Sequence, residues 1–190
     1  MKNYLIVLCL LLVSNLSAQQ WQIASPDGKI QMRIHSGENL GYSVSYNGKT
    51  LVCDSPLGFE FKGEKPMSGG FTLVNIPSME AKSDTWGPVV KNKHGKVKVS
   101  WNEMTLALKE GAGDRRRMDF IVRVYDDGIA FRYQLYGARK IGNRQITREL
   151  TGFSLPVNAI GWAAKYKRNY TSSQEAEFVP TRLGVLPVDT

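Results

Sequence analysis

Residues 117–135 read RMDFIVRVYDDGIAFRYQL, and this stretch carries the strongest structural signal in the chain. Apolar and polar side chains alternate on both sides of Asp-Asp-Gly, a pattern typical of a β-hairpin. Gly128 can take the positive φ angle that a tight turn needs, and Asp127 tolerates it better than most residues. One face of each strand is therefore apolar: Phe120, Val122 and Val124 before the turn, and Ile129, Phe131 and Tyr133 after it. We expect Arg123 and Arg132 on the opposite, solvated face.

The rest of the chain repeats this two-residue period and shows little helical periodicity. Residues 41–53 contain Asn47-Gly48, a second hairpin signal. Further strands are predicted at 28–36, 58–62, 71–76, 96–101, 104–110, 151–156 and 161–170. The polar segment 172–182, SSQEAEFVPTR, is predicted to be a loop. Short strands separated by turns favour an all-β, antiparallel sandwich over an α/β fold.

The first 18 residues have the features of a secretory signal peptide. Lys2 precedes an apolar run at 5–13, which is too short to span a membrane comfortably, and Ser17-Ala18 supplies small residues for cleavage. This interpretation implies export across the inner membrane and a periplasmic location, without a membrane span after cleavage. A retained membrane anchor is the alternative.

Composition argues against nucleic acid as a partner. The chain has 25 Lys and Arg against 17 Asp and Glu, a net charge of +8. The basic clusters at 91–98, 115–117 and 165–168 are short, and they alternate with apolar residues or sit beside a glycine-rich turn. We therefore interpret them as solvated strand faces and turns. Cys53 is the only cysteine after residue 18, which excludes an internal disulfide in the mature chain.

Few residues can support catalysis or metal binding. His35 and His94 are the only histidines and are far apart in sequence, which argues against a zinc site or a Ser-His-Asp triad. Glu175 and Glu177 lie in a polar loop of the kind that provides calcium ligands. Two glutamates alone do not make a calcium site, because Ca²⁺ takes six or more oxygen ligands. The residues by themselves therefore assign no catalytic centre.

Taken in order, these segments resemble the N-terminal domain of glycoside hydrolase family 97, which contains secreted α-glucosidases and α-galactosidases. Residues 117–135 match most closely. The other matching segments are SPDGKIQMRI, YSVSYNGKTLV, Trp86, WNEMTLALKE, ITRELTGFSLP, Trp162 and SSQEAEF. The resemblance implies that residues 19–190 form an antiparallel β-super-sandwich domain, incomplete at its C-terminal end. A catalytic (β/α)8 barrel, absent from this chain, would follow it.

The resemblance also implies a function. The complete enzyme would hydrolyse α-glycosidic bonds in oligosaccharides, with its catalytic carboxylates on the barrel and none in this chain. In the family, a glutamate of this domain, in a motif resembling Tyr-Glu-x-x-Tyr, reaches a calcium ion in the active site. Gln174, Glu175 and Phe178 align with that motif, which makes Glu175 the candidate Ca²⁺ ligand and Glu177 the alternative.

Two other functions compete with this one. A free-standing carbohydrate-binding module would need an exposed aromatic platform, for which the candidates are Trp21, Trp86, Trp101 and Trp162. Core packing is the expected role of most of them. A structural or interaction domain of an envelope protein is the third hypothesis.

Overall fold

The computed structural model describes residues 19–90, 93, 95–111, 113, 115–136, 144–164 and 177–185. Regular structure in these residues consists of antiparallel strands and one short 3-10 helix, which confirms the all-β prediction. The first strands are β1 (Gln19–Ala24), β2 (Ile30–Ser36), β3 (Leu40–Tyr46), β4 (Lys49–Pro56), β5 (Phe59–Phe61), β6 (Phe71–Leu73) and β7 (Ser78–Trp86). The others are β8 (Val97–Glu110), β9 (Arg117–Tyr125), β10 (Ile129–Leu135), β11 (Ile146–Glu149), β12 (Ile160–Ala163) and β13 (Val179–Arg182), followed by η1 (Leu183–Val185). None of the described helical residues forms a helix long and apolar enough to cross a membrane.

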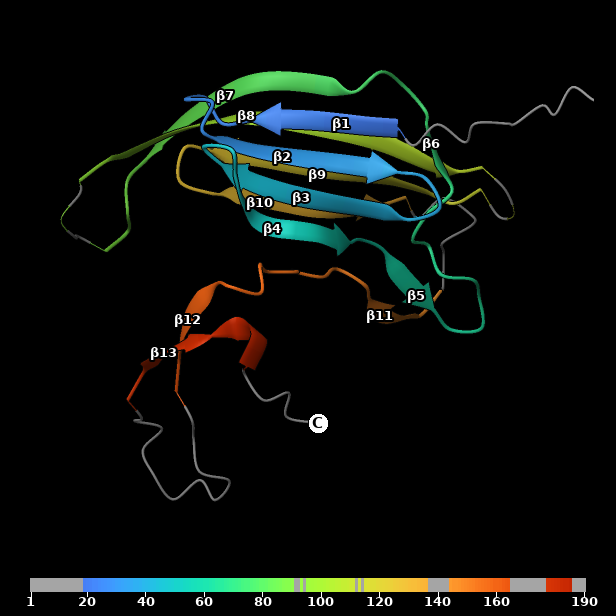
Figure 1. Ribbon diagram of the computed structural model, residues 1–190. Coiled ribbons are helices and arrows are strands. Elements are labelled where there is room, and N and C mark those ends of the chain that lie inside the picture. Colours follow the sequence, from blue (N-terminus) through green and yellow to red (C-terminus); the bar gives the residue numbers. More distant parts are fainter. Residues whose placement is uncertain are drawn as a thin grey trace, which may run out of the picture.

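Two antiparallel sheets face each other and form the predicted sandwich (Figure 1). One sheet has the strand order β1-β2-β3-β4, and the other has the order β10-β9-β8. Both β6 and β7 pair with the remaining edge of β8, β6 at residues 108–110 and β7 at residues 97–105. β1 lies against β8 and β2 against β9, so the two sheets pack face to face.

The predicted hairpin is present as β9 and β10, with Val124 opposite Ile129, but its turn differs from the expected one. Residues 125–128 connect the two paired positions, and the Tyr125 N–H donates to the Gly128 carbonyl oxygen over 2.8 Å. Loops of this length are usually built on a type I turn, whose central residues keep negative φ angles. Gly128 is accordingly not in the left-handed region.

Two other turn contacts hold the strands in register. Asn47 and Gly48 have φ angles of 46° and 77°, as a type I′ turn requires, which confirms the second predicted hairpin. At the other hairpin, an Asp126 carboxylate oxygen accepts the Asp27 N–H over 2.9 Å. The β9–β10 turn is thereby joined to the β1–β2 turn of the opposite sheet.

The core fills the space between the inward faces of the two sheets. Alternate residues of the central strands are buried: Ile30, Met32 and Ile34 in β2, Leu40, Tyr42 and Val44 in β3, Met104, Leu106 and Leu108 in β8, and Met118, Phe120, Val122 and Val124 in β9. Burying each large apolar side chain stabilises the fold by about 1.5–3 kcal/mol. The alternation in the sequence therefore identifies the core face of each strand.

The inward face of β10 is covered by β5 and the segment after β11. The Phe59 and Tyr133 rings lie 4.7 Å apart, and the Phe131 and Phe153 rings 6.4 Å apart, measured between centroids. The Tyr133 hydroxyl and Thr151 Oγ1 form a hydrogen bond of 2.7 Å. Burial raises the pKa of Tyr133 to about 12, so its hydroxyl remains protonated beneath this cover.

Strand β8 corrects the prediction of separate strands at 96–101 and 104–110. It runs without a break from Val97 to Glu110. Trp101 is buried on the outer face of the sheet, whereas Met104 is buried in the core. The apolar pattern therefore changes phase inside one continuous strand, which explains why the sequence predicts two.

Two C-terminal predictions are also wrong. Residues 151–156 form no regular strand. The Gly152 N–H donates to the Pro56 carbonyl oxygen over 3.0 Å and the Cys53 N–H to the Ser154 carbonyl oxygen over 2.7 Å, but the Ser154 N–H turns to the Ser55 side-chain oxygen over 2.9 Å, which interrupts the ladder beside β4. Part of the predicted loop 172–182 is strand β13, whose pairing with β12 places Ala163 opposite Val179. Local sequence does not reveal a partner that lies 16 positions away.

A buried ion pair closes one end of the sandwich and corrects the expected solvation of the 115–117 cluster. Arg116 is only 4% exposed, and its Nη2 and Nε atoms contact the two Glu110 carboxylate oxygens at 2.6 and 2.7 Å. Nη2 also donates to the Lys65 carbonyl oxygen over 3.0 Å, and the guanidinium lies over the Phe61 ring. Arg116 therefore connects the end of β8 to the loop after β5.

Candidate functional site

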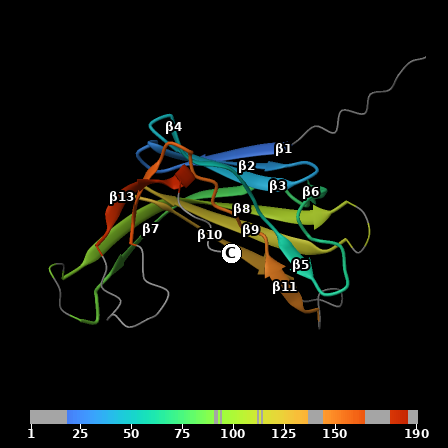
Figure 2. The same cartoon turned by 60° about the horizontal axis from the view of Figure 1, so that its bottom comes forward.

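The β12–β13 hairpin lies outside the two main sheets (Figure 2). It is a candidate functional surface because it exposes large apolar side chains. Trp162, in β12, is paired with Pro180 in β13 and is 69% exposed. The hairpin is supported from behind, where the Leu183 N–H donates to the Ala159 carbonyl oxygen over 2.9 Å. Replacing Gly161 with a larger residue would bring a Cβ atom within 2.7 Å of the Leu183 side chain.

Other exposed apolar side chains lie near Trp162 in the sequence. They are Phe153, Leu155, Val157, Ile160, Phe178 and Val179, each between 45% and 76% exposed, and alternation places Val179 on the opposite side of the two-stranded sheet from Trp162. We call these residues with Trp162 the hairpin face. Single exposed apolar residues are ordinary on soluble domains, but a set this large within 27 residues of sequence indicates a surface that contacts another molecule or domain.

The predicted metal ligand Glu175, together with Gln174, lies outside the described residues. Glu177 is described and is exposed, immediately before Phe178 of the hairpin face. Since Ala163 and Val179 are paired, the segment that contains Glu175 leaves and re-enters the hairpin at the same end. Among the described residues, no three His, Cys, Asp or Glu side chains gather closely enough to hold a metal ion.

The other singled-out polar residues have structural surroundings. His35 Nε2 lies 2.6 Å from an Asp54 carboxylate oxygen, and this pair sits on the outer face of the first sheet. His94 lies outside the described residues. Cys53 is a partly buried free thiol in β4.

The four tryptophans do not form one aromatic platform. Trp21 packs against the core, and Trp101 is 9% exposed beneath Arg123, whose guanidinium carbon lies 5.0 Å from the ring centroid. Trp86 ends β7 and is half exposed, while Trp162 lies in a different sheet. Core packing is therefore confirmed for Trp21, and Trp101 is buried on the outer face of its sheet. Trp86 and Trp162 are exposed enough to contact another molecule or domain.

A charge ladder on the outer face of the second sheet was not predicted from the sequence. The Glu103 carboxylate contacts Lys82 Nζ and Arg123 Nε, each at 2.6 Å. These two cations, Lys82 first, lower the pKa of Glu103 to about 2. Arg123 is on the outer face as predicted, but it is held by an ion pair and a ring contact, while Arg132 is exposed as expected. Only the β7–β8–β9 register brings these residues together.

Comparison with known proteins gives a consistent result. The model of a family described as glycosyl-hydrolase 97 N-terminal matches residues 23–189. A retaining alpha-galactosidase of Bacteroides thetaiotaomicron is 26% identical over 193 residues, covering 95% of this chain and 27% of that protein. A probable retaining alpha-galactosidase of Streptomyces bingchenggensis is 29% identical over 146 residues, covering 77% and 21%.

Solved structures include a relative of the same family. A glycoside hydrolase family 97 enzyme from Pseudoalteromonas sp. strain K8, in complex with panose, superimposes with a TM-score of 0.68 at 28% identity. The match covers 75% of this chain and 22% of the enzyme. The chain thus spans between a fifth and about a quarter of the length of the relatives it matches.

Proposed function

Because the chain belongs to the glycosyl-hydrolase 97 N-terminal family, we propose that it is the non-catalytic N-terminal domain of an enzyme that hydrolyses α-glycosidic bonds. Two of its relatives are named as retaining alpha-galactosidases, and the solved relative was captured with panose. These names support an α-linked oligosaccharide as the substrate class. The catalytic carboxylates would lie on the barrel that the resemblance implies, beyond the residues of this chain.

The hairpin face is the observation that carries the proposal. Trp162, Val157 and Ile160 are each at least 66% exposed, although Trp162 and Ile160 belong to a paired strand and Val157 to the hydrogen-bonded turn before it. Exposed apolar area of this kind is stabilised when a partner surface removes it from water. We therefore assign the hairpin face to packing against the catalytic barrel, with the sandwich acting as a buttress.

The packing role predicts that the chain alone associates through the hairpin face. Light scattering across a wide concentration range should show oligomers, and the double substitution Val157→Ser and Trp162→Ser should reduce them. Trp86→Ser is the matched control, since Trp86 is also exposed but lies on β7 of the second sheet. A wild-type chain that remains monomeric at every concentration, or one whose association needs Trp86 instead, would contradict this role.

We propose further that Glu175 supplies one ligand to a calcium ion at the barrel's active site. A carboxylate oxygen is the donor that this hard cation prefers. The described residues on the two sides of the segment that contains Glu175 meet at the Ala163–Val179 pair, and exposed Phe178, assigned to the barrel contact, lies beside that pair. Bound calcium would act there as a Lewis acid, and Glu175 would orient it without contacting the substrate.

The carbohydrate-binding alternative is favoured by one observation, the exposure of Trp162. The two functions differ in what happens to this ring in the complete protein. As part of the interface it is buried by the barrel, and as a sugar platform it remains exposed.

A further inference from the structure

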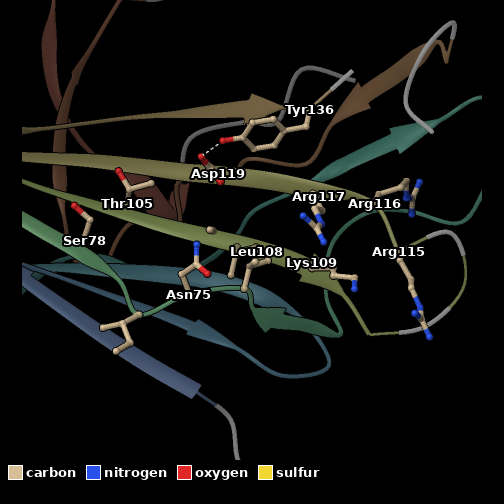
Figure 3. A pocket seen from close by; sticks show the side chains of 13 residues that line it. Asn75, Ser78, Thr105, Leu108, Lys109, Arg115, Arg116, Arg117, Asp119 and Tyr136 are labelled. Atoms are coloured by element: carbon tan, nitrogen blue, oxygen red, sulfur yellow. Dashed lines mark hydrogen bonds between the residues drawn. The ribbon is translucent and has the colours of Figure 1, made fainter. Parts of the chain in front are cut away.

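A hollow on the outer face of the second sheet lies away from the hairpin face (Figure 3). It forms where the edge of β8 changes partner. β6 ends at Leu73 opposite Leu108, and β7 begins at Ser78 opposite Thr105. The Val74 N–H still donates to the Ala107 carbonyl oxygen over 2.8 Å, and residues 75–77 then leave the edge of β8. The space left over Ala107 has a volume of about 760 Å³, within the range of small-molecule sites.

One end of the hollow is strongly basic. Lys109 and Arg117 are direct cross-strand partners on the outer face, and Arg115 lies beside them with a φ angle of 53°. Like charges placed directly opposite each other destabilise a sheet. Within the described residues, no carboxylate forms an ion pair with any of these three cations. The pair is therefore a place where an external anion would relieve repulsion.

The run Arg115-Arg116-Arg117 divides its charges between two sites. Arg116 turns inward to the buried Glu110 carboxylate, as strand alternation requires. Its two neighbours then point outward, and Figure 3 shows them with Lys109 at the same end of the hollow.

The other end of the hollow offers neutral polar groups. Ser78 and Thr105 present hydroxyls there, and Asn75 contributes an amide between the two ends (Figure 3). The Tyr136 ring forms part of the wall, and its hydroxyl donates to the Asp119 carboxylate, which raises the pKa of Tyr136. Among the described residues that line the hollow, Asp119 is the one carboxylate, and it is engaged by Tyr136.

From this arrangement of a basic end and a neutral polar end we infer that the hollow binds a small acidic saccharide, that is, a hydroxyl-rich ligand with a carboxylate group. Arginine side chains match the planar geometry of a carboxylate and bind it through two parallel hydrogen bonds. The hydroxyl and amide groups of the neutral end would pair with sugar hydroxyls, and the Ala107 floor leaves room for a ring. The site is separate from the hairpin face and does not depend on the role proposed for it.

Calorimetric titration of the full chain at low ionic strength tests the inference, with digalacturonate, the neutral disaccharide galactobiose and inorganic sulfate as probes. Digalacturonate should bind at least tenfold more tightly than either of the others. The double variant Lys109→Gln/Arg117→Gln should lose at least tenfold in affinity. Arg132→Gln is the matched control, because Arg132 is an exposed arginine on the same outer face but does not line the hollow, and it should bind as wild type does.

Folding does not obscure this test, since the double variant removes a like-charge pair and should unfold at no lower urea concentration than wild type. Failure of digalacturonate to bind would overturn the inference, as would equal binding by the folded double variant. Equal affinity for sulfate and digalacturonate would reduce the hollow to a general anion site and would also overturn it. Equal affinity for galactobiose would show that the cations do not select the ligand.

Discussion

Replacing Arg116 with methionine should destabilise the chain more than any substitution on its surface. The guanidinium is 4% exposed and Glu110 is 11% exposed, and two contacts of 2.6 and 2.7 Å join them. Arg116→Met keeps much of the side-chain volume but leaves the Glu110 carboxylate buried beside a neutral thioether. Removing one partner of a buried ion pair costs about 3–5 kcal/mol. For a domain of this size, such a loss lowers the melting temperature by on the order of 10 °C.

Urea unfolding followed by far-ultraviolet circular dichroism measures this loss, provided that the slope of free energy against urea stays unchanged. The double variant Arg116→Met/Glu110→Leu should recover at least half of it, because no unpaired charge remains buried. Glu64→Gln is the control. Glu64 is 27% exposed and contacts Arg116 at 3.4 Å and Arg144 at 2.7 Å, and because it is less buried than Glu110 its loss should cost less than that of Arg116. Two results would refute this explanation. One is a loss of unfolding free energy below about 1 kcal/mol for Arg116→Met. The other is a double variant whose loss equals the sum of the losses of Arg116→Met and Glu110→Leu measured separately.

Two further predictions concern other carboxylates. The pKa of Glu103 is lowered to about 2 from 4.5, so its ion pairs with Lys82 and Arg123 stabilise the fold above pH 4.5 and cease to do so as the pH falls towards 2. The difference in unfolding free energy between wild type and Glu103→Gln should therefore shrink across this range, and a constant difference would contradict the assignment. In the complete enzyme, Glu175→Gln should shift the calcium titration of activity to higher concentration, with partial rescue by excess calcium, while Glu177→Gln should titrate as wild type does. If Glu177→Gln shifts the calcium titration and Glu175→Gln does not, the ligand is Glu177. If neither variant shifts it, neither glutamate is a calcium ligand.

The parts of the fold that depend on local chemistry were predictable from the sequence. Asn47-Gly48 and the alternation around residues 120–133 specify two hairpins and their core faces without knowledge of any partner. β7 could not be predicted in the same way. Its residues, SMEAKSDTW, show no apolar alternation, because most of the strand is exposed and its place is set by pairing with β8.

Features that depend on register between distant strands were not predictable. Arg116 and its neighbours have the same charge, yet Arg116 is buried because strand alternation turns it to Glu110, six positions earlier in the chain. Glu103 meets Lys82 across 21 positions and Arg123 across 20. Their contact follows from three strands pairing in one register, and no local motif records it. The hairpin face likewise depends on the pairing of β12 with β13. The long polar segment between the two strands hides this pairing from a local reading of the sequence.

The central claim is that this chain is the non-catalytic N-terminal domain of an α-glycosidase. Hydrolysis of 4-nitrophenyl α-galactoside and α-glucoside, measured with calcium present, tests it most directly when the chain alone is compared with the same chain joined to the proposed catalytic barrel. The chain alone should release no more nitrophenol than a heat-inactivated sample, and the joined protein should hydrolyse at least one of the two substrates. Turnover by the chain alone, or a folded joined protein that cleaves neither substrate, would contradict it.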